Sequence, residues 1–144
     1  MAVYNKFNCF VEDVMEGKHN FASNTIKAAL TNTLPTSSLT TFSQITEITS
    51  GSGYAQGGIA ITITSSSATG GVYKLVLQDT TFTAGGAVGP FRYIVLYNST
   101  ETTKPLICWF DYGSSLSLNS GETFLLNFDD VNGLLTLSLS LIHI

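Results

Sequence analysis

The sequence predicts a mainly β protein, an antiparallel β-sandwich of jelly-roll-like form that carries one N-terminal amphipathic helix. Short runs rich in β-branched and aromatic residues follow one another, separated by turn residues roughly every eight to fifteen positions. One run near the start has the helical period instead. At 144 residues and 15.4 kDa the chain has the size of one domain, and residues 1–138 are expected to form it.

The helix is expected from Tyr4 to about Gly17, with Asn5 able to cap its start and Gly17 its end. Five apolar residues in this run recur at spacings of three and four, with polar residues opposite them: Phe7, Phe10, Val11, Val14 and Met15. A short helix with so large an apolar face has to lie on something. We therefore expect it to lie on the sheet.

Seven strands are expected after the helix: Ile26–Thr31, Gly58–Thr64, Val72–Thr83, Phe91–Asn98, Leu106–Tyr112, Glu122–Phe128 and a last one from Leu134. The clearest alternation is Ile59, Ile61 and Ile63 against small polar neighbours, which predicts one buried and one wet face. Asn132-Gly133 predicts a hairpin turn between the last two strands. Residues 34–58 are expected to form an ordered surface excursion, with a short turn of helix at Phe42–Ile48.

Two of these strands are apolar on both faces. Phe91, Tyr93, Val95 and Tyr97 alternate with Ile94 and Leu96, while Leu106, Cys108 and Phe110 are backed by Ile107 and Trp109. One face is expected to form the sandwich core. The other needs a cover, which is either the N-terminal helix or a neighbouring subunit.

Sparse charge narrows the choice of partners. Only 11% of the residues are charged, the net charge is −4, and Glu47 is the one charged residue between Lys27 and Lys74. Serine and threonine, about a quarter of the chain, cover the surface instead, and hydroxyls oppose self-association only weakly. Without a basic cluster no nucleic-acid partner is expected, and apolar stretches far shorter than ~20 residues predict no membrane span.

No catalytic, cofactor-binding or metal site is predicted, and the chain is not expected to be an enzyme. His19 and His143 fall in no nucleophile–base pattern, and His19 is expected at the surface or as a cap. Cys9 and Cys108 lack metal-ligand spacing and are interpreted as small buried hydrophobes, with a disulfide as the alternative. Four carboxylates at strand ends or turns are expected to bond backbone amides: Asp79, Asp111, Asp129 and Asp130.

Two further motifs have competing interpretations. Tyr93, Tyr97, Trp109 and Tyr112 could form a sugar-stacking platform, but their spacing within strands favours core packing. The triplet at residues 98–100 matches a glycosylation acceptor, which has no meaning without a secretory route. The N-terminus lacks an apolar signal segment because Lys6, Glu12 and Asp13 interrupt it, so synthesis in a cytoplasm is expected.

Several segments together resemble a family of small, largely uncharacterised proteins encoded by tailed bacteriophages and found in viral metagenomes. They are Phe7–Asn20 (FNCFVEDVMEGKHN), Lys27–Pro35 (KAALTNTLP), Ile45–Ile48 (ITEI), Gly89–Asn98 (GPFRYIVLYN) and Trp109–Gly113 (WFDYG). The similarity spans nearly the whole chain up to about Ser138. It implies a virion-associated structural role and carries over no active site.

The last six residues, Leu139–Ile144 (LSLIHI), are what CTG TCT CTT ATA CAC ATC encodes, a transposon end used as an adapter in sequencing libraries. We therefore expect the natural chain to stop before them, which would leave His143 without biological meaning. The competing interpretation is a genuine terminal strand. It rests on the alternation of Leu135, Leu137, Leu139 and Leu141 with hydroxyl residues.

The leading hypothesis is a non-enzymatic, phage-type structural protein that self-assembles by strand-edge pairing into a helical fibril or tube. Its partners would be copies of itself and other virion proteins, and it would lie in a virion or an extracellular filament. The alternatives are a capsid decoration protein and a glycan-binding module. The residues expected to carry assembly or packing are Phe7, Phe10 and Val14 for docking the helix, and Tyr93, Tyr97 and Trp109 for the apolar sheet faces.

Overall fold

A five-stranded antiparallel sheet forms the first layer of the protein. The computed structural model describes residues 2–140, and it is mainly β, with 47% strand in antiparallel sheets that do not close into a barrel. The first sheet has the strand order β1 (Val3–Lys6), β8 (Leu106–Leu118), β7 (Val88–Asn98), β2 (Ile26–Thr31) and β3 (Ile59–Ile61). The prediction of an antiparallel β-sandwich with one helix is confirmed, and β2 has the predicted bounds.

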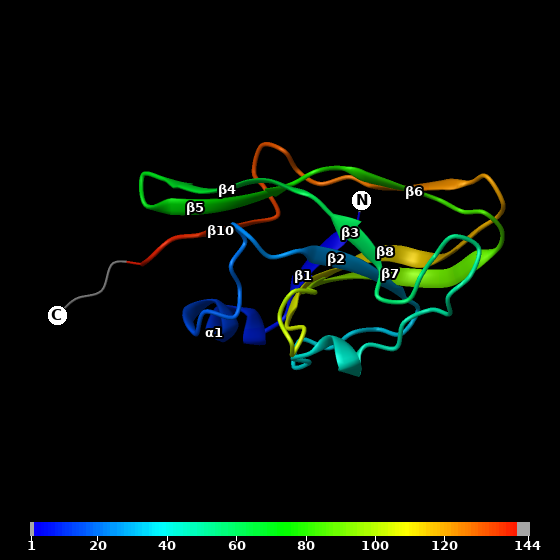
Figure 1. The fold of residues 1–144 in the computed structure, drawn as a ribbon, viewed down its shortest axis with the longest axis horizontal. Coiled ribbons are helices and arrows are strands. Elements are labelled where there is room, and N and C mark those ends of the chain that lie inside the picture. Colours follow the sequence, from blue (N-terminus) through cyan, green and yellow to red (C-terminus); the bar gives the residue numbers. More distant parts are fainter. Residues whose placement is uncertain (1, 141–144) are drawn as a thin grey trace.

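The second layer is built around one long line of chain that the sequence predicts as a single strand. It consists of β5 (Val72–Leu77) and β6 (Thr80–Thr83), interrupted at residues 78–79. On one side β5 pairs with β4 (Ile63–Thr69). On the other side, β6 pairs with β9 (Thr123–Leu126), and β5 pairs with β10 (Leu135–Leu137). Figure 1 shows this layer above the first one, with the β4–β5 hairpin projecting beyond it.

The predicted hairpin at Asn132-Gly133 is wrong. β9 and β10 do not pair with each other, because they lie end to end along the β5–β6 line and residues 127–134 loop out between them. Asp129 organises this loop, accepting hydrogen bonds from the amides of Val131 and Asn132, each at 2.8 Å. Gly133 has φ +79° and passes so close to β5 that a Cβ there would lie 2.5 Å from the Leu75 carbonyl oxygen. The turn signal was real, but it closes a loop rather than a hairpin.

One side of the sandwich is closed by continuous chain and the opposite side is open. β3 ends at Ile61 and β4 begins at Ile63, so the chain crosses from the first layer to the second without a loop. The predicted alternation holds along this crossing, since Ile61 is buried while Ala60 and Thr62 are exposed. At the other side the edge strands β1 and β9 belong to different layers and do not pair.

The helix is shorter than predicted. Residues 3–6 form β1, paired antiparallel with β8, and α1 begins at Cys9 and ends at Met15 (Cys9–Met15). Asn8, not Asn5, occupies the N-cap position, and its side chain makes no capping bond. Gly17, with φ +77°, follows the end of the helix as expected. Pairing with β8 satisfies the backbone groups on one side of β1 and overrides the start of the predicted helix, Tyr4–Lys6.

Bulges decide which face of β7 and β8 each side chain joins. The register of this pair shifts between Phe91 and Tyr93 and again between Leu96 and Tyr97. Phe91 therefore packs in the main core with Ile94 and Leu96, whereas the sequence placed it on the face of Tyr93. A two-residue period cannot reveal an inserted residue, because every side chain beyond it changes face.

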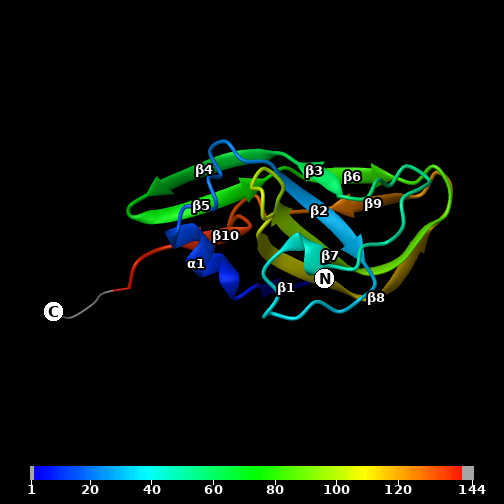
Figure 2. The same ribbon diagram turned by 60° about the horizontal axis from the view of Figure 1, so that its bottom comes forward.

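Both faces of this strand pair are covered within one chain. The main cluster lies between the two layers, and the smaller one lies on the outer face of the first sheet, where it contains Ala29, Val95 and Leu106. The segment of residues 32–58 covers the outer face through Leu39, Phe42 and Ile45, and Figure 2 shows it crossing the front of β7. The expected helix contributes part of this cover, through Phe7 and through Cys9 at the start of α1, and residues 32–58 supply the rest. The predicted helical turn is present as η1 (Phe42–Gln44).

The C-terminal segment leaves the body of the sandwich after β10. The alternating leucines form a strand as far as Leu137, and Leu139 is 90% exposed. Leu141 and His143, on which the two interpretations of the tail also rest, lie outside the described residues. The adapter origin of the last six residues stays a prediction.

Candidate assembly surfaces

The six residues expected to carry assembly or packing are buried or partly buried within the folded subunit. Phe7, Tyr93, Tyr97 and Trp109 come together in the outer cluster, each at most 7% exposed. The Trp109 ring lies 4.6 Å from Phe7, and the Tyr97 ring stacks on Phe42 with centroids 4.0 Å apart. Phe10 and Val14 instead pack against the main cluster through α1. These side chains pack within the subunit, so the aromatic rings among them are not available to bind a sugar or a second copy.

Glu47, the lone charge of a long uncharged stretch, fastens the covering segment to the sheet. Its carboxylate accepts hydrogen bonds from the Gly57 amide at 2.8 and 2.9 Å and from the Tyr54 hydroxyl. The Tyr54 hydroxyl in turn accepts the Leu30 amide at 3.0 Å, and the Tyr97 hydroxyl donates to the Gly57 carbonyl. Burial raises the pKa of the Tyr97 hydroxyl to about 12. Every one of these groups is engaged, so the cluster is structural.

The longest exposed edge is the continuous line of β3 and β4. Residues 59–69 contain no charged residue, no proline and no glycine. Among the described strands β4 pairs with β5 alone, and β3 with β2 alone, so the outer backbone groups of both strands face away from the sheets. Ser67, Ala68 and Thr69 are exposed. This edge lacks the charges and prolines that commonly protect edge strands, and its one register shift lies between Ile63 and Ser65.

A groove runs along part of this edge, where the chain before β2 diverges from β4. Its volume is about 580 Å³, and its walls are residues 21–25 on one side and residues 60–66 on the other. Hydroxyl and amide side chains dominate the lining, including Ser23, Asn24 and Ser65. The backbone of β4 is therefore reachable from solvent at this point.

The open side of the sandwich holds an aromatic cleft of about 640 Å³ between β1, β8 and β9. Tyr4 and Phe110 meet edge to face at 5.5 Å, and Tyr112 and Phe124 do so at 5.9 Å. Tyr4 and Tyr112 are 41% and 44% exposed. The cleft arises because no strand joins the two layers on this side.

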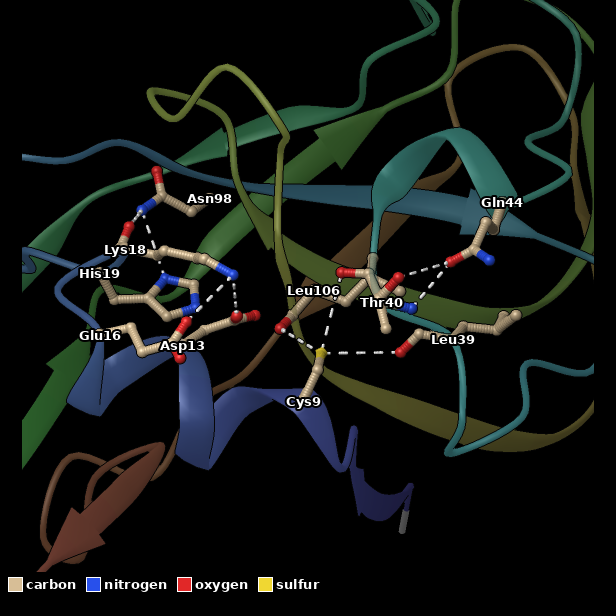
Figure 3. Close-up of polar contacts among 10 residues, drawn as sticks. All are labelled: Cys9, Asp13, Glu16, Lys18, His19, Leu39, Thr40, Gln44, Asn98 and Leu106. Carbon is tan, nitrogen blue, oxygen red and sulfur yellow. Dashed lines mark hydrogen bonds and ion pairs between the residues drawn. The ribbon is translucent and has the colours of Figure 1, made fainter.

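A polar junction fixes α1 to the end of β7. Asn98 is fully buried. Its side-chain amide nitrogen donates to the Asn24 side-chain oxygen at 2.8 Å and lies 3.3 Å from His19 Nδ1. Its side-chain oxygen accepts a hydrogen bond from the Thr100 amide. The buried Asp13 pairs with Lys18 at 2.8 Å. Figure 3 shows this group at one end of α1. Asn98 is therefore inaccessible to glycosylation.

His19 is not the surface residue expected from the sequence. Its ring stacks on Phe21 and packs tilted against Phe10, with centroids 5.3 and 5.1 Å away, and the buried Nε2 atom has no hydrogen-bond partner among the described residues. Burial lowers the pKa of the imidazole to about 4. The side chain is thus neutral at pH 7 and acts as part of the packing between α1 and the loop that follows it.

The thiols and carboxylates have structural partners. Cys9 and Cys108 are free, and Cys108 is buried. Cys9 is half-buried, and its thiol lies within hydrogen-bonding distance of three carbonyl oxygens, those of Leu39, Thr40 and Leu106, to one of which it can donate (Figure 3). Burial raises the pKa of the Cys9 thiol to about 11, so it is protonated at neutral pH. Asp79 accepts the Phe128 amide at 2.7 Å.

Asp111 likewise serves the backbone and a neighbouring strand. It accepts the Gly113 amide at 2.8 Å and pairs with Arg92 on β7 at 2.8 Å. The hydrogen bond from Arg92 is the largest cause that lowers the pKa of this carboxyl below its usual range. The expectation that these turn carboxylates bond backbone amides is confirmed for Asp79, Asp111 and Asp129.

Within residues 2–140, no three side chains of His, Cys, Asp or Glu converge as metal ligands would. In the same part of the chain, no helix is both long and apolar enough to cross a bilayer. Comparison with protein-family models, curated proteins and solved structures gave no match. The resemblance to phage-encoded proteins stays a prediction.

Sequence reasoning missed both surfaces that the fold leaves open. The edge of β4 and the cleft beside Tyr4 depend on which strands end a sheet, and strand order does not follow from periodicity. One sequence feature could have found the first. The longest charge-free part of the chain after Glu47 includes a well-formed alternating strand, and edge strands that avoid pairing normally carry a charge.

Proposed function

We propose that this chain is a structural subunit that assembles with copies of itself through the free edges of its sheets, giving a repeating homopolymer such as a fibril or tube. The observation that carries the proposal is the edge of residues 59–69, which is extended, uncharged and without a partner strand on its outer side among the described strands, and whose last three residues are exposed. A free edge offers a row of backbone donors and acceptors, and pairing with another strand satisfies them.

A filament needs two contact regions on one subunit, and the first sheet ends in two opposite edges. β3, continued by β4, forms one of them, and β1 forms the other beside the aromatic cleft. Tyr4 and Val3, which is 60% exposed, would gain cover from a neighbour at the second edge. The low charge adds support, because copies carrying few charges repel one another weakly.

The decoration-protein alternative uses the same surfaces on a preformed lattice. It differs in one observable, since such a protein stays monomeric on its own. The glycan-binding alternative loses its proposed anchor, because Trp109 is 7% exposed beneath the covering segment. A sugar would have to use Tyr4 and Tyr112 at the open cleft instead.

Negative-stain electron microscopy of the untagged protein across a concentration series tests the proposal. Fibres or tubes of uniform width are expected, growing in number with concentration. A monomer that persists at high concentration, measured in parallel by sedimentation velocity, would contradict self-assembly and favour the decoration protein. Residues 1–138 should be compared with the full chain, because the last six residues are expected to be foreign to it.

A further inference from the structure

We infer that β4 of one subunit pairs antiparallel with β4 of a second copy about a two-fold axis, so that their β4–β5–β10 sheets become one continuous sheet. This inference rests on the proposed self-assembly and names the contact that starts it. The occupant of the free edge is therefore a second copy of this chain, placed strand against strand.

Geometry makes β4 the most accessible edge. The β4–β5 hairpin projects from the body of the sandwich, as Figures 1 and 2 both show, so a second copy can approach it without meeting the first sheet. Exposure increases toward its tip, where Thr69 is exposed and Val72 is 43% exposed. The groove along residues 60–66 reaches the same edge from its other end.

The other edges carry features that hinder pairing. β1 has four residues, ends in Lys6, and has one backbone carbonyl, that of Val3, occupied by the Asn5 side-chain amide at 3.2 Å. The loop of residues 127–134, with Asp129 and Asp130 exposed, separates β9 from β10. Lysines, prolines, short strands and bulges are devices that protect edges. β4 has seven residues without a charge or a proline, and beyond its one register shift, between Ile63 and Ser65, residues 65–69 are regularly paired with β5.

The absence of charge leaves pairing of the strand with its own copy unopposed. In a two-fold pair each residue lies near its own counterpart, so any charged residue close to the axis would face a like charge, which destabilises the pair. The seven residues of β4, Ile63–Thr69, carry no charge. Serine and threonine dominate the strand, and hydroxyls opposite each other can exchange hydrogen bonds because each both donates and accepts.

Disulfide trapping tests the register directly. Single cysteines at Ser65, Ser66 and Ser67 are made in a Cys9→Ser background, in which the remaining Cys108 is fully buried. A residue on the two-fold axis lies opposite its own copy at a Cβ separation of roughly 4.5 to 5.5 Å, close enough for oxidation to join the two chains. Ser43→Cys, on the exposed η1 turn, is the matched control, and Val3→Cys compares the β1 edge with the β4 edge.

We expect a covalent dimer as the dominant product from one of the three serine positions, with its yield falling at the positions on either side and little from Val3. Cross-linking at Val3 without cross-linking in β4 would overturn this inference and leave self-assembly intact. A protein that is monomeric in sedimentation and gives no cross-link anywhere would overturn both proposals.

Charge insertion gives a second readout that needs no oxidation. Ser67→Lys brings two ammonium groups close to each other in the paired strands and should raise the dissociation constant of the dimer on the order of a hundredfold. Ser43→Lys, on the exposed η1 turn, adds the same charge away from the edge and should leave it unchanged. An unchanged dissociation constant for Ser67→Lys, in a variant with the parent's circular dichroism, would exclude β4 from the contact.

Discussion

Strands β7 and β4 belong to one sandwich, yet they meet their surroundings in opposite ways. β7 lies between two strands and is covered on both faces, so residues 93–98 are all buried. β4 has one neighbouring strand, and its last three residues, Ser67–Thr69, are exposed. The strand that stabilises the fold and the strand that is free to pair with another molecule are therefore different. Apolar residues are concentrated in strands that are covered, and hydroxyl residues in the strand whose outer backbone groups are unpaired.

The largest expected effect comes from removing an aromatic ring under the double cover. Tyr97→Ala deletes a side chain that is 1% exposed and stacked on Phe42, and it should lower the free energy of unfolding by about 3 to 5 kcal/mol. Tyr112→Ala, at a 44% exposed position, should cost less than about 1 kcal/mol. Guanidinium denaturation followed by tryptophan fluorescence measures both. Equal losses would show that the outer cluster is not a core.

A smaller effect is expected from releasing the covering segment. Glu47→Ala leaves the Gly57 amide and the Tyr54 hydroxyl without their acceptor, which should cost about 1 to 3 kcal/mol. Amide hydrogen exchange should quicken at Gly57 and Tyr54 before it quickens in β7. Asp130→Ala, at an exposed carboxylate in the 127–134 loop, is the control, and similar exchange in both variants would contradict the role given to Glu47.

Acid should weaken the junction between α1 and β7. Because burial lowers the pKa of His19 to about 4, the unfolded chain, with the ordinary value near 6.5, binds the proton more readily. Stability from this group is therefore complete above about pH 6.5 and is lost as the pH falls toward 4. The charged groups facing the ring, Asp13 and Lys18, act in opposite directions on its pKa.

Urea unfolding at intervals between pH 7 and pH 4 measures this loss. His19→Phe keeps an aromatic ring between Phe10 and Phe21 and removes the titrating group, so its stability should change less over the same range. The carboxyls with lowered pKa values, Asp111 and Asp129, lose their contribution to stability only toward the acid end of this range, and both proteins share that loss. Parallel curves for the two proteins would refute the role of His19.

The smallest effect is expected on the exposed edge. Ser67→Lys should change the stability of the monomer by no more than about 0.5 kcal/mol, because its side chain is exposed and makes no hydrogen bond to the sheet beside it. Thermal unfolding at a protein concentration too low for assembly measures the stability of the monomer alone. A loss as large as that of Tyr97→Ala would mean that β4 is part of the core.

Several elements were predictable because their causes are local. The period-two pattern located β2, the crossing at residues 59–63 and the middle of β7, since alternation reports which side chains leave water. Gly17 follows the end of the helix with a positive φ, a conformation that glycine adopts readily. Turn carboxylates such as Asp129 bonded nearby amides, an interaction that spans two or three residues.

Other elements failed because their causes lie far along the chain. Residues 4–6 lie within the predicted helix, but residues 3–6 become β1 because β8, more than a hundred residues later, offers a free edge. Phe91 changes face because of a bulge whose partner is Leu116. His19 is half-buried because Phe10, Phe21 and Asn98 meet around it.

The sequence by itself determined that this protein is a charge-poor, antiparallel β-sandwich with one short helix and with two strands that need cover on both faces. Composition and periodicity encode those properties, because each residue's transfer from water depends mainly on its own side chain. Only the tertiary structure decided that the chain covers Tyr97 and Trp109 with its own residues 32–58, and that β4 is left at an edge. Strand order and cover depend on contacts between distant segments, which a local pattern does not specify.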